Sequence, residues 1–446
     1  MKRLGICATL IATAAAVAVC QPAQPEQELT LESAIAAALQ NNREVRIAEL
    51  EVRKAAERTA SYASRKLPNL SVGLIGGQLL TRIAFQFPAG AFGVYPSTGP
   101  IPAQSSEIST SRRPVAFANA TVMQPITQLR RVNLSVRMGQ LGEELARMHV
   151  QTQRQIVVSE VRKLYYAMVQ SQSGLETLKD SLDFVHELDR VVAQYVSERV
   201  ALRSDGLEVK ARILRMESQS MTLSHALATQ KEQMNLLLGR DVRTEFRVAA
   251  LAEPAAYEND VRTAQTAAIQ KRPELREARL KQQQAEYDRR VKRAEYIPEV
   301  SAMFGYLSPF GVSMLPSNIA VAGVSMTWEP FDWGRKKHEL AEKEGTLKQA
   351  ALGIQQAESA VLVEVAAAFR KLEEARMQVK VALMSQELAK EQFRVVKTRY
   401  EEKSALLRDV LQQQAAVTDA NGQYTQALLS FWTAKADFEK AIGQDF

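Results

Sequence analysis

An internal repeat limits how this chain can fold. Residues 38–71 align without a gap with residues 268–301. Each copy predicts a polar, alanine-rich helix that ends at a proline and passes into alternating residues. An element built twice predicts an architecture built twice, so we interpret the chain as two repeats, residues 19–254 and 255–446. The identical positions, numbered in the first copy, are Ala38, Gln40, Glu44, Arg46, Ala48, Leu50, Ala55, Pro68 and Ser71.

Composition favours extended helices over a thick globular core. Only 6% of the 446 residues are aromatic, while Ala, Gln, Glu, Lys, Leu and Arg crowd the long segments. The net charge of +7 is small beside 57 basic and 50 acidic residues, and the two signs alternate. Solvated helix faces explain this pattern better than a nucleic-acid surface, although the basic run at residues 289–293 keeps the second reading open. We therefore expect no nucleic-acid partner.

The N-terminus predicts export from the cytoplasm. Lys2 and Arg3 precede an apolar run, and Ala16-Val17-Ala18 supplies small residues for cleavage, so residues 1–18 are interpreted as a signal peptide. Cys20 leaves an alternative open, cleavage at residue 20 followed by lipidation, although Val19 is not the small residue expected before a lipidated cysteine. No later stretch is apolar enough for a membrane-spanning helix, so any span must be built from strands.

Proline positions predict where long helices lie. No proline occurs between Pro125 and Pro254 or after Pro330, and a proline inside a helix costs about 3 kcal/mol. Each tract carries apolar residues at three- and four-residue steps and contains a turn, near residues 200–206 and 401–408. The sequence thus predicts two long helical hairpins. In each half an earlier helix precedes them, over about residues 30–66 and 261–296.

Four segments alternate as strands do, at about residues 68–82, 115–125, 298–307 and 318–330. Residues 87–114 are rich in Gly, Pro and Ser and predict an exposed loop, whose role the sequence leaves open. Four strands cannot close a barrel, and an open sheet edge in lipid leaves backbone groups unpaired. The strands therefore require oligomerisation if they cross a bilayer, and three copies would supply twelve strands.

Taken together, these segments resemble the TolC family of outer-membrane efflux and secretion ducts. The matching segments are Leu29–Asn42 (LTLESAIAAALQNN), residues 271–275 (KRPEL), Pro125 and Pro330 between strand and helix, Leu236–Gly239, and the tip from Arg399-Tyr400 through Leu406–Leu411. The resemblance covers the whole mature chain.

The resemblance implies an α+β membrane protein of two structural repeats. Its long helical hairpins would form a trimeric periplasmic α-barrel joined to a twelve-stranded transmembrane β-barrel, four strands per protomer. Such a homotrimer would work in the outer membrane of a Gram-negative bacterium with a periplasmic adaptor protein and an inner-membrane pump of RND, ABC or MFS type. It would export drugs, toxic compounds, metals or polypeptides, with no cofactor and no chemistry of its own.

The resemblance also suggests site residues. Tyr400, Arg408, Asp409 and Gln412 fall where the family narrows its tunnel, and we expect three copies of Asp409 to form a cation-attracting ring. The pattern departs from the family, because Gln412 replaces a second acid and Ala405 replaces an arginine. The alternative is a solvated acid at a helix start. At the first hairpin the same position holds Asp205-Gly206-Leu207, which we expect to contact the adaptor.

Other features carry less specific predictions. Trp328 and Trp333 flank the end of the last strand, where interfacial aromatic residues or ordinary packing would both place them. The four histidines are scattered, and the sequence contains no metal-binding, phosphate-binding or nucleophile motif, which argues against an enzyme and a metal site. A soluble periplasmic coiled-coil adaptor remains an alternative, as does a duct committed to a polypeptide. The first would not need two proline-bounded strand pairs.

Overall fold

The computed structural model describes residues 27–110, 113–199, 202–249, 260–312, 315–402 and 404–444. The predicted signal peptide, Cys20 and the predicted boundary between the repeats at residues 254–255 lie outside these residues. No described helix has an apolar stretch long enough to cross a membrane.

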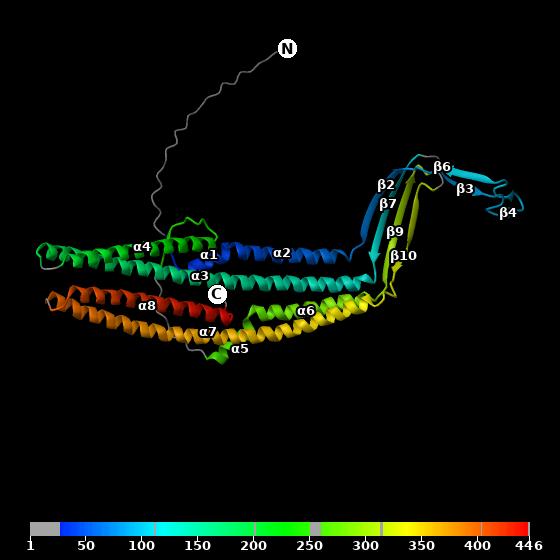
Figure 1. The fold of residues 1–446 in the computed structure, drawn as a ribbon. Helices are drawn as coiled ribbons and strands as arrows, with labels where there is room; N and C mark the ends of the chain where they lie inside the picture. Colours follow the sequence, from blue (N-terminus) through cyan, green and yellow to red (C-terminus); the bar gives the residue numbers. More distant parts are fainter. Residues whose placement is uncertain are drawn as a thin grey trace, which may run out of the picture. The chain divides into compact units, whose positions relative to one another are not determined.

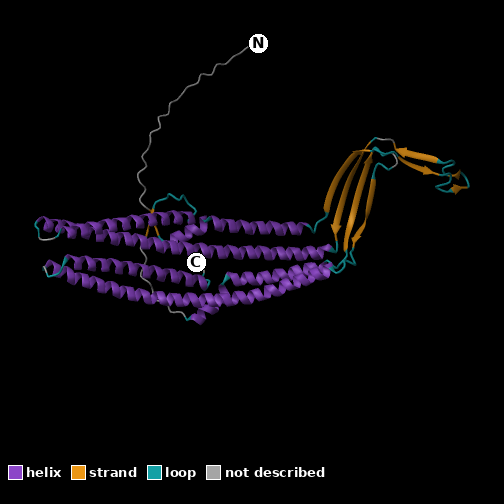
Figure 2. Cartoon of the chain, in the orientation of Figure 1, coloured by secondary structure: helices purple, strands orange, loops and turns teal. Residues whose placement is uncertain are grey.

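Long helices and antiparallel strands alternate along the chain (Figures 1 and 2). In order, the elements are β1 (Gln27–Leu29), α1 (Leu31–Asn41), α2 (Arg43–Ser64), β2 (Asn69–Gln78), β3 (Ile83–Phe87), β4 (Val94–Tyr95), β5 (Gly99–Pro100), β6 (Ser106–Thr110), β7 (Pro114–Pro125), α3 (Gln128–Ser197), α4 (Arg203–Leu237), β8 (Phe246–Val248), α5 (Val261–Lys271), α6 (Pro273–Ala294), β9 (Glu299–Phe310), β10 (Ile319–Thr327), α7 (Arg335–Glu401) and α8 (Leu407–Ala441).

The described residues fall into two compact units. The first comprises the described parts of residues 1–41, 160–255 and 378–433, and the second comprises those of residues 42–159, 256–377 and 434–446. The first unit therefore contains both hairpin turns, and the second contains the four-stranded sheet. Each unit draws residues from both halves of the sequence.

The single helices expected over about residues 30–66 and 261–296 were wrong in one respect. Each of them is divided into two helices, α1 and α2 in the first half and α5 and α6 in the second. Asn42 separates α1 from α2, and its side chain caps α2 by accepting hydrogen bonds from the backbone N–H groups of Glu44 and Val45. Pro273 is the first residue of α6, where its missing N–H leaves no bond unmade. Every bound of α5 and α6 lies 230 residues after the corresponding bound of α1 and α2.

The first unit has a small parallel ladder between β1 and β8 beside α3. Tyr165 of α3 is fully buried, and its hydroxyl lies 3.0 Å from the carbonyl oxygens of both Leu29 and Ala249. Burial raises the pKa of Tyr165, because the phenolate would lose its hydration. The side chain thus fixes both strands to the long helix.

In the second unit, β10, β9, β7 and β2 form one antiparallel sheet in that order. Register places Leu70 opposite Val122 and Val122 opposite Phe304, so these side chains share a face. That face is mainly apolar across the four strands. It carries Leu70, Val72, Leu74, Val122, Phe304, Tyr306, Val324 and Met326, together with the polar residues Gln124 and Ser308. The opposite face is mixed. It carries the small or polar residues Ser71, Asn119, Thr121, Gly305 and Ser325, and also the apolar residues Ile75, Phe117, Leu307 and Val321.

The expectation of a loop over residues 87–114 is wrong in part. β3 pairs with β6, beginning just after β2 ends, and β4 pairs with β5 beyond it. Phe85 lies opposite Ile108, while Gln86 lies opposite Glu107, so this hairpin has one apolar and one polar side. Arg82 fixes the polar side through Glu107 at 2.7 Å. The alternation of Ile83, Phe85 and Phe87 is the sequence signal for this strand.

Candidate functional site

The turns of the two helical hairpins form the candidate site, in the first compact unit. The chain leaves α3 through Arg199, whose φ of 58° is left-handed, and enters α4 at Arg203. The second turn leaves α7 at Glu401 and enters α8 at Leu407. Each turn thus reverses the chain within a few residues, and the tips present the first turns of α4 and α8.

Asp205 and Asp409 occupy the same position at these two helix starts. Each is the third residue of its helix, and its carboxylate accepts a hydrogen bond from the backbone N–H three residues earlier. The distances are 3.1 Å from Leu202 to Asp205 and 3.2 Å from Leu406 to Asp409. The negative charge also lies next to the positive end of the helix dipole. Both aspartates therefore have a local capping role.

Apolar packing joins the start of α8 to the first hairpin. Leu411 belongs to a buried cluster formed mainly by α3 and α4, and Leu407 packs against it. The ring of Phe184 on α3 meets that of Phe393 on α7 edge to face at 5.5 Å. The other buried members of the cluster are Leu178, Val185, Leu188, Val192, Val209, Ile213 and Met216.

A groove of about 900 Å³ lies between the hairpins at this end. Its floor is apolar, with Leu188, Val192 and Leu407 among its residues. Four acidic side chains and one basic side chain line it, namely Glu187, Glu198, Asp205, Glu401 and Lys397. Arg190 pairs with Glu187 at 2.6 Å. The groove therefore combines an apolar floor with an acidic rim.

Tyr400 lies in this groove together with Tyr195 and Asp205. The pKa of Tyr400 is raised, mainly because burial disfavours its phenolate. Electrostatic repulsion from Tyr195 and Asp205 disfavours the same phenolate further. The neutral phenol is the form that the site favours. Tyr400 can thus donate a hydrogen bond to a partner in the groove.

The structure brings only some of the predicted site residues together. Tyr400 and Asp205 share the groove, whereas Asp409 does not line it. The side chains of Arg408 and Gln412 are exposed and form no hydrogen bond or ion pair among the described residues. Leu207 is exposed beside Gly206.

Sequence reasoning did not name Glu198 and Glu401 as site residues, although both line the groove. Their only signal was their position at the predicted turns.

The two predicted interfacial tryptophans lie at the junction between β10 and α7. Trp328 is exposed, and Trp333 is 89% exposed with a left-handed φ of 56°, which is unfavourable for a bulky residue. Asp332 holds this turn by accepting hydrogen bonds from the backbone N–H groups of Gly334 and Lys336. The indole of Trp333 meets Phe331 edge to face at 4.9 Å. The junction thus holds aromatic rings away from the protein.

Residues 265–444 match the outer membrane efflux protein family. The resemblance to this family is confirmed. No curated protein matches the sequence significantly. The matched segment contains α6, β9, β10, α7 and α8, and therefore the whole second hairpin with Tyr400 and Asp409.

Solved structures of outer membrane channels share the fold over nearly the whole chain. The CmeC outer membrane channel of Campylobacter jejuni aligns with a TM-score of 0.76 at 17% identity, covering 93% of this chain and 85% of that one. The outer-membrane channel OprN aligns with a TM-score of 0.75 at 16% identity, over 93% and 90%. CusC, whose structures concern transmembrane channel formation, aligns with a TM-score of 0.75 at 15% identity, over 95% and 98%. At these identities the likeness establishes the fold, which the chain shares with channels.

Proposed function

We propose that the chain is one protomer of an outer-membrane export duct that passes small molecules or polypeptides out of the cell. Three copies would complete a twelve-stranded barrel in the outer membrane and a helical tunnel in the periplasm. A periplasmic adaptor and an inner-membrane pump would deliver the cargo. In this arrangement the pump selects the substrate, and the duct supplies the passage.

The sheet is the observation that carries this proposal. Its outer strands β10 and β2 each have a neighbour on one side only within the sheet, so both edges leave backbone groups free to pair with another copy. One face is mainly apolar across all four strands, as a lipid-facing surface requires. Pairing β2 of one copy with β10 of the next would close the sheet and satisfy both edges.

Exposed apolar stripes on the long helices support the same assembly. Val381, Met384 and Leu388 follow three- and four-residue steps on α7, and all are more than half exposed. Leu207, Leu214 and Met221 form a second exposed stripe at seven-residue steps on α4. Such stripes are typical of helices that pack against further helices, which neighbouring copies would supply.

Oligomeric mass tests this proposal directly. The protein purified from membranes in detergent should have the mass of three chains by native mass spectrometry. A protein recovered only from the soluble fraction as a monomer would refute the barrel and favour the soluble adaptor.

We further propose that Asp409 contributes to a closed, cation-attracting entrance at the helical tips. One carboxylate oxygen caps α8, and the side chain is only partly buried, so its charge remains available to a passing ion. Three such carboxylates around one axis would attract cations. Arg408 and Gln412 would lie beside this ring, and Tyr400 would hold the closed tip from within the groove.

Two substitutions separate the charge of Asp409 from its capping role. Asp409→Asn keeps an oxygen that can accept the Leu406 N–H but removes the charge, whereas Asp409→Ala removes both. If the ring exists, both variants should lose block by multivalent cations in single-channel recordings. If Asp409→Asn retained cation block, the proposed role of the Asp409 charge in the gate would be contradicted.

The tip groove is the proposed contact surface for the adaptor. Its apolar floor and acidic rim suit a helical partner that presents apolar and basic residues. Leu406 lines the groove and is exposed, and Leu406→Asp should abolish crosslinking to the adaptor of the same export system. Glu187→Gln is the matched control, because Arg190 already neutralises that rim carboxylate. Equal crosslinking of both variants would contradict this assignment.

Trp328 and Trp333 are proposed to lie at the lipid–water boundary. Brominated lipids should therefore quench their fluorescence and leave that of Trp432, which lies in the other compact unit, unchanged. Equal quenching of a Trp328→Phe/Trp333→Phe double variant and the parent would show that these residues are not in contact with lipid.

A further inference from the structure

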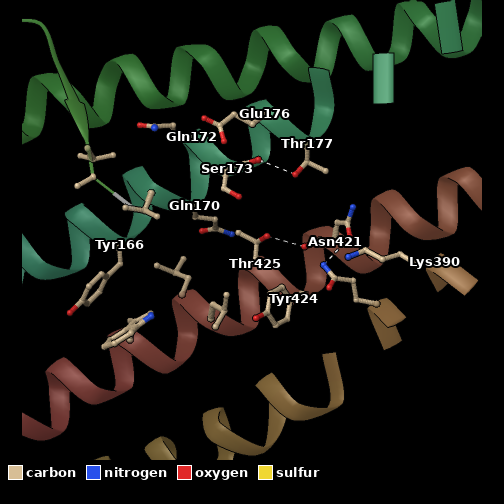
Figure 3. Close-up of a pocket in the computed structure, with 17 residues that line it drawn as sticks. Tyr166, Gln170, Gln172, Ser173, Glu176, Thr177, Lys390, Asn421, Tyr424 and Thr425 are labelled. Atoms are coloured by element: carbon tan, nitrogen blue, oxygen red, sulfur yellow. Dashed lines mark hydrogen bonds between the residues drawn. The ribbon is translucent and has the colours of Figure 1, made fainter. Parts of the chain in front are cut away.

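A second cavity, of about 500 Å³, lies in the first compact unit and is separate from the tip groove (Figure 3). Residues of α3, α7, α8 and the end of β8 line it, and none of them lines the groove. Its volume falls within the range of sites that hold small organic molecules. The comparisons and the proposed duct assign it no role.

One end of the cavity is aromatic and aliphatic. The rings of Tyr166 and Trp432 lie 5.7 Å apart at 34°. Leu428, Leu429 and Val248 are among the other apolar residues that line the cavity. A flat ring inserted here would exchange water for aromatic and aliphatic contacts. The apolar end therefore suits the ring of a ligand.

The other end is polar and already ordered. The Gln386 side-chain amide donates to the Asn421 side-chain oxygen at 2.9 Å, and the Thr425 hydroxyl donates to the Asn421 backbone oxygen at 2.9 Å. Lys390 extends toward these residues, and Tyr166 lies at the far side of the cavity (Figure 3). Preformed polar groups of this kind fix the orientation of a ligand.

The charge balance selects an anion. Lys390 and Glu176 are the only charged residues that line the cavity. Arg247 neutralises Glu176 at 3.1 Å, whereas the ammonium group of Lys390 forms no hydrogen bond or ion pair within the described ranges. The cavity thus offers one uncompensated positive charge.

We propose that this cavity binds a small amphipathic organic anion. Its ring would lie against Tyr166 and Trp432, and its anionic group would face Lys390 and Asn421. The ligand would join α3 to α7 and α8, on both sides of the cavity. The proposal does not depend on the transport activity, because binding is measured without any passage of ions or cargo.

Calorimetry on the full chain in detergent tests the proposal with two probes of nearly equal shape, 2-naphthoate and neutral 2-naphthamide. A titration into protein-free detergent corrects for partitioning. We expect one saturable naphthoate site per chain, with naphthoate bound more tightly than naphthamide. Lys390→Gln should weaken naphthoate about tenfold, the loss of one charge-assisted contact, and leave naphthamide unchanged.

Two further variants complete the design. Lys380→Gln removes an exposed lysine of the same helix that does not line the cavity, so both probes should bind as in the parent. Ser173→Phe places a ring inside the cavity and should weaken both probes, with an unchanged circular dichroism spectrum showing that the variant is folded. Absence of saturable binding, equal naphthoate affinity of Lys390→Gln and the parent, or full binding by Ser173→Phe would each overturn the proposal.

Discussion

Arg272 links the break between α5 and α6 to the end of α8. Replacing it should therefore lower the local stability at the end of α8 by a measurable amount. Its side chain is only 6% exposed and contacts Glu274 at 2.9 Å and Glu364 at 2.8 Å. The same guanidinium donates to the backbone oxygens of Ala441 at 3.2 Å and Lys440 at 3.4 Å. It therefore caps the last turn of α8 by donating to the Ala441 oxygen and by sharing the Lys440 oxygen with the Gly443 N–H.

The contacts of Arg272 determine how much local stability the variant Arg272→Met should lose. A hydrogen bond to a charged group contributes about 1.5–3 kcal/mol, and Arg272 makes several. The side chains of Glu274 and Glu364 are 35% and 46% exposed, so both carboxylates regain water in the variant and part of the loss is recovered. We expect a local loss of about 2–3 kcal/mol, which corresponds to about 30- to 150-fold faster exchange through local opening.

Hydrogen exchange measures this loss without requiring reversible unfolding of the whole protein. The reporters are the amides of Ile442 and Gly443, which donate to the oxygens of Phe438 and Lys440. The control is Arg279→Met, because Arg279 is 50% exposed and makes a single 3.5 Å contact with Glu358. That variant should change stability by no more than about 0.5 kcal/mol. Equal exchange in the two variants would refute the reasoning.

Further predictions concern the helix ends, the tip and the junction. Gly239→Ala should lower the melting temperature more than Gly443→Ala, since both have φ of +68° but the added Cβ would lie 2.3 Å from the Asn41 backbone oxygen and only 3.2 Å from the Lys271 Cβ; equal shifts would contradict this. The raised pKa of Tyr400 stabilises the fold below its ordinary pKa of about 10, and this contribution should be lost as pH rises through the folded value. Tyr400→Phe should therefore reduce the alkaline loss of stability followed by circular dichroism, and an unchanged profile would exclude this cause. Asp332→Ala should leave the backbone amides of Gly334 and Lys336 without their acceptor and destabilise the start of α7 by about 1 kcal/mol, seen as faster hydrogen exchange there; unchanged exchange would argue against the cap.

The long helices were predictable because their determinants are local. Proline-free tracts with apolar steps of three and four residues predict α3, α4, α7 and α8. Gly239 and Gly443 end the two hairpins with left-handed φ, as helix-stopping glycines do. The strands followed from a different local signal, the alternation of side chains, and the resemblance to the TolC family implied the α+β class.

The breaks at Asn42 and Arg272 were missed although the sequence carries signals for both. Asn42 reads as one more polar residue on a helix until its side chain is seen to cap α2. The residue before Pro273 is disfavoured in helical conformation, which marked the second break. In both places a strong overall helical pattern outweighed a single local signal.

The sites depend on contacts that the sequence does not specify. The tip groove combines residues from four helices, and its acidic rim appears only when Glu198, Asp205 and Glu401 come together. The cavity likewise needs Lys390 and Trp432 from different helices. For Asp409, the family resemblance suggested a gate position, and the structure adds the hydrogen bond from the Leu406 N–H, which gives this carboxylate a capping role.

Conductance across a planar bilayer tests the central claim most directly. The account predicts that trimer-sized particles insert and form small, cation-preferring pores that are mostly closed. A monomer that never enters the bilayer, or particles of trimer mass that never conduct, would contradict it.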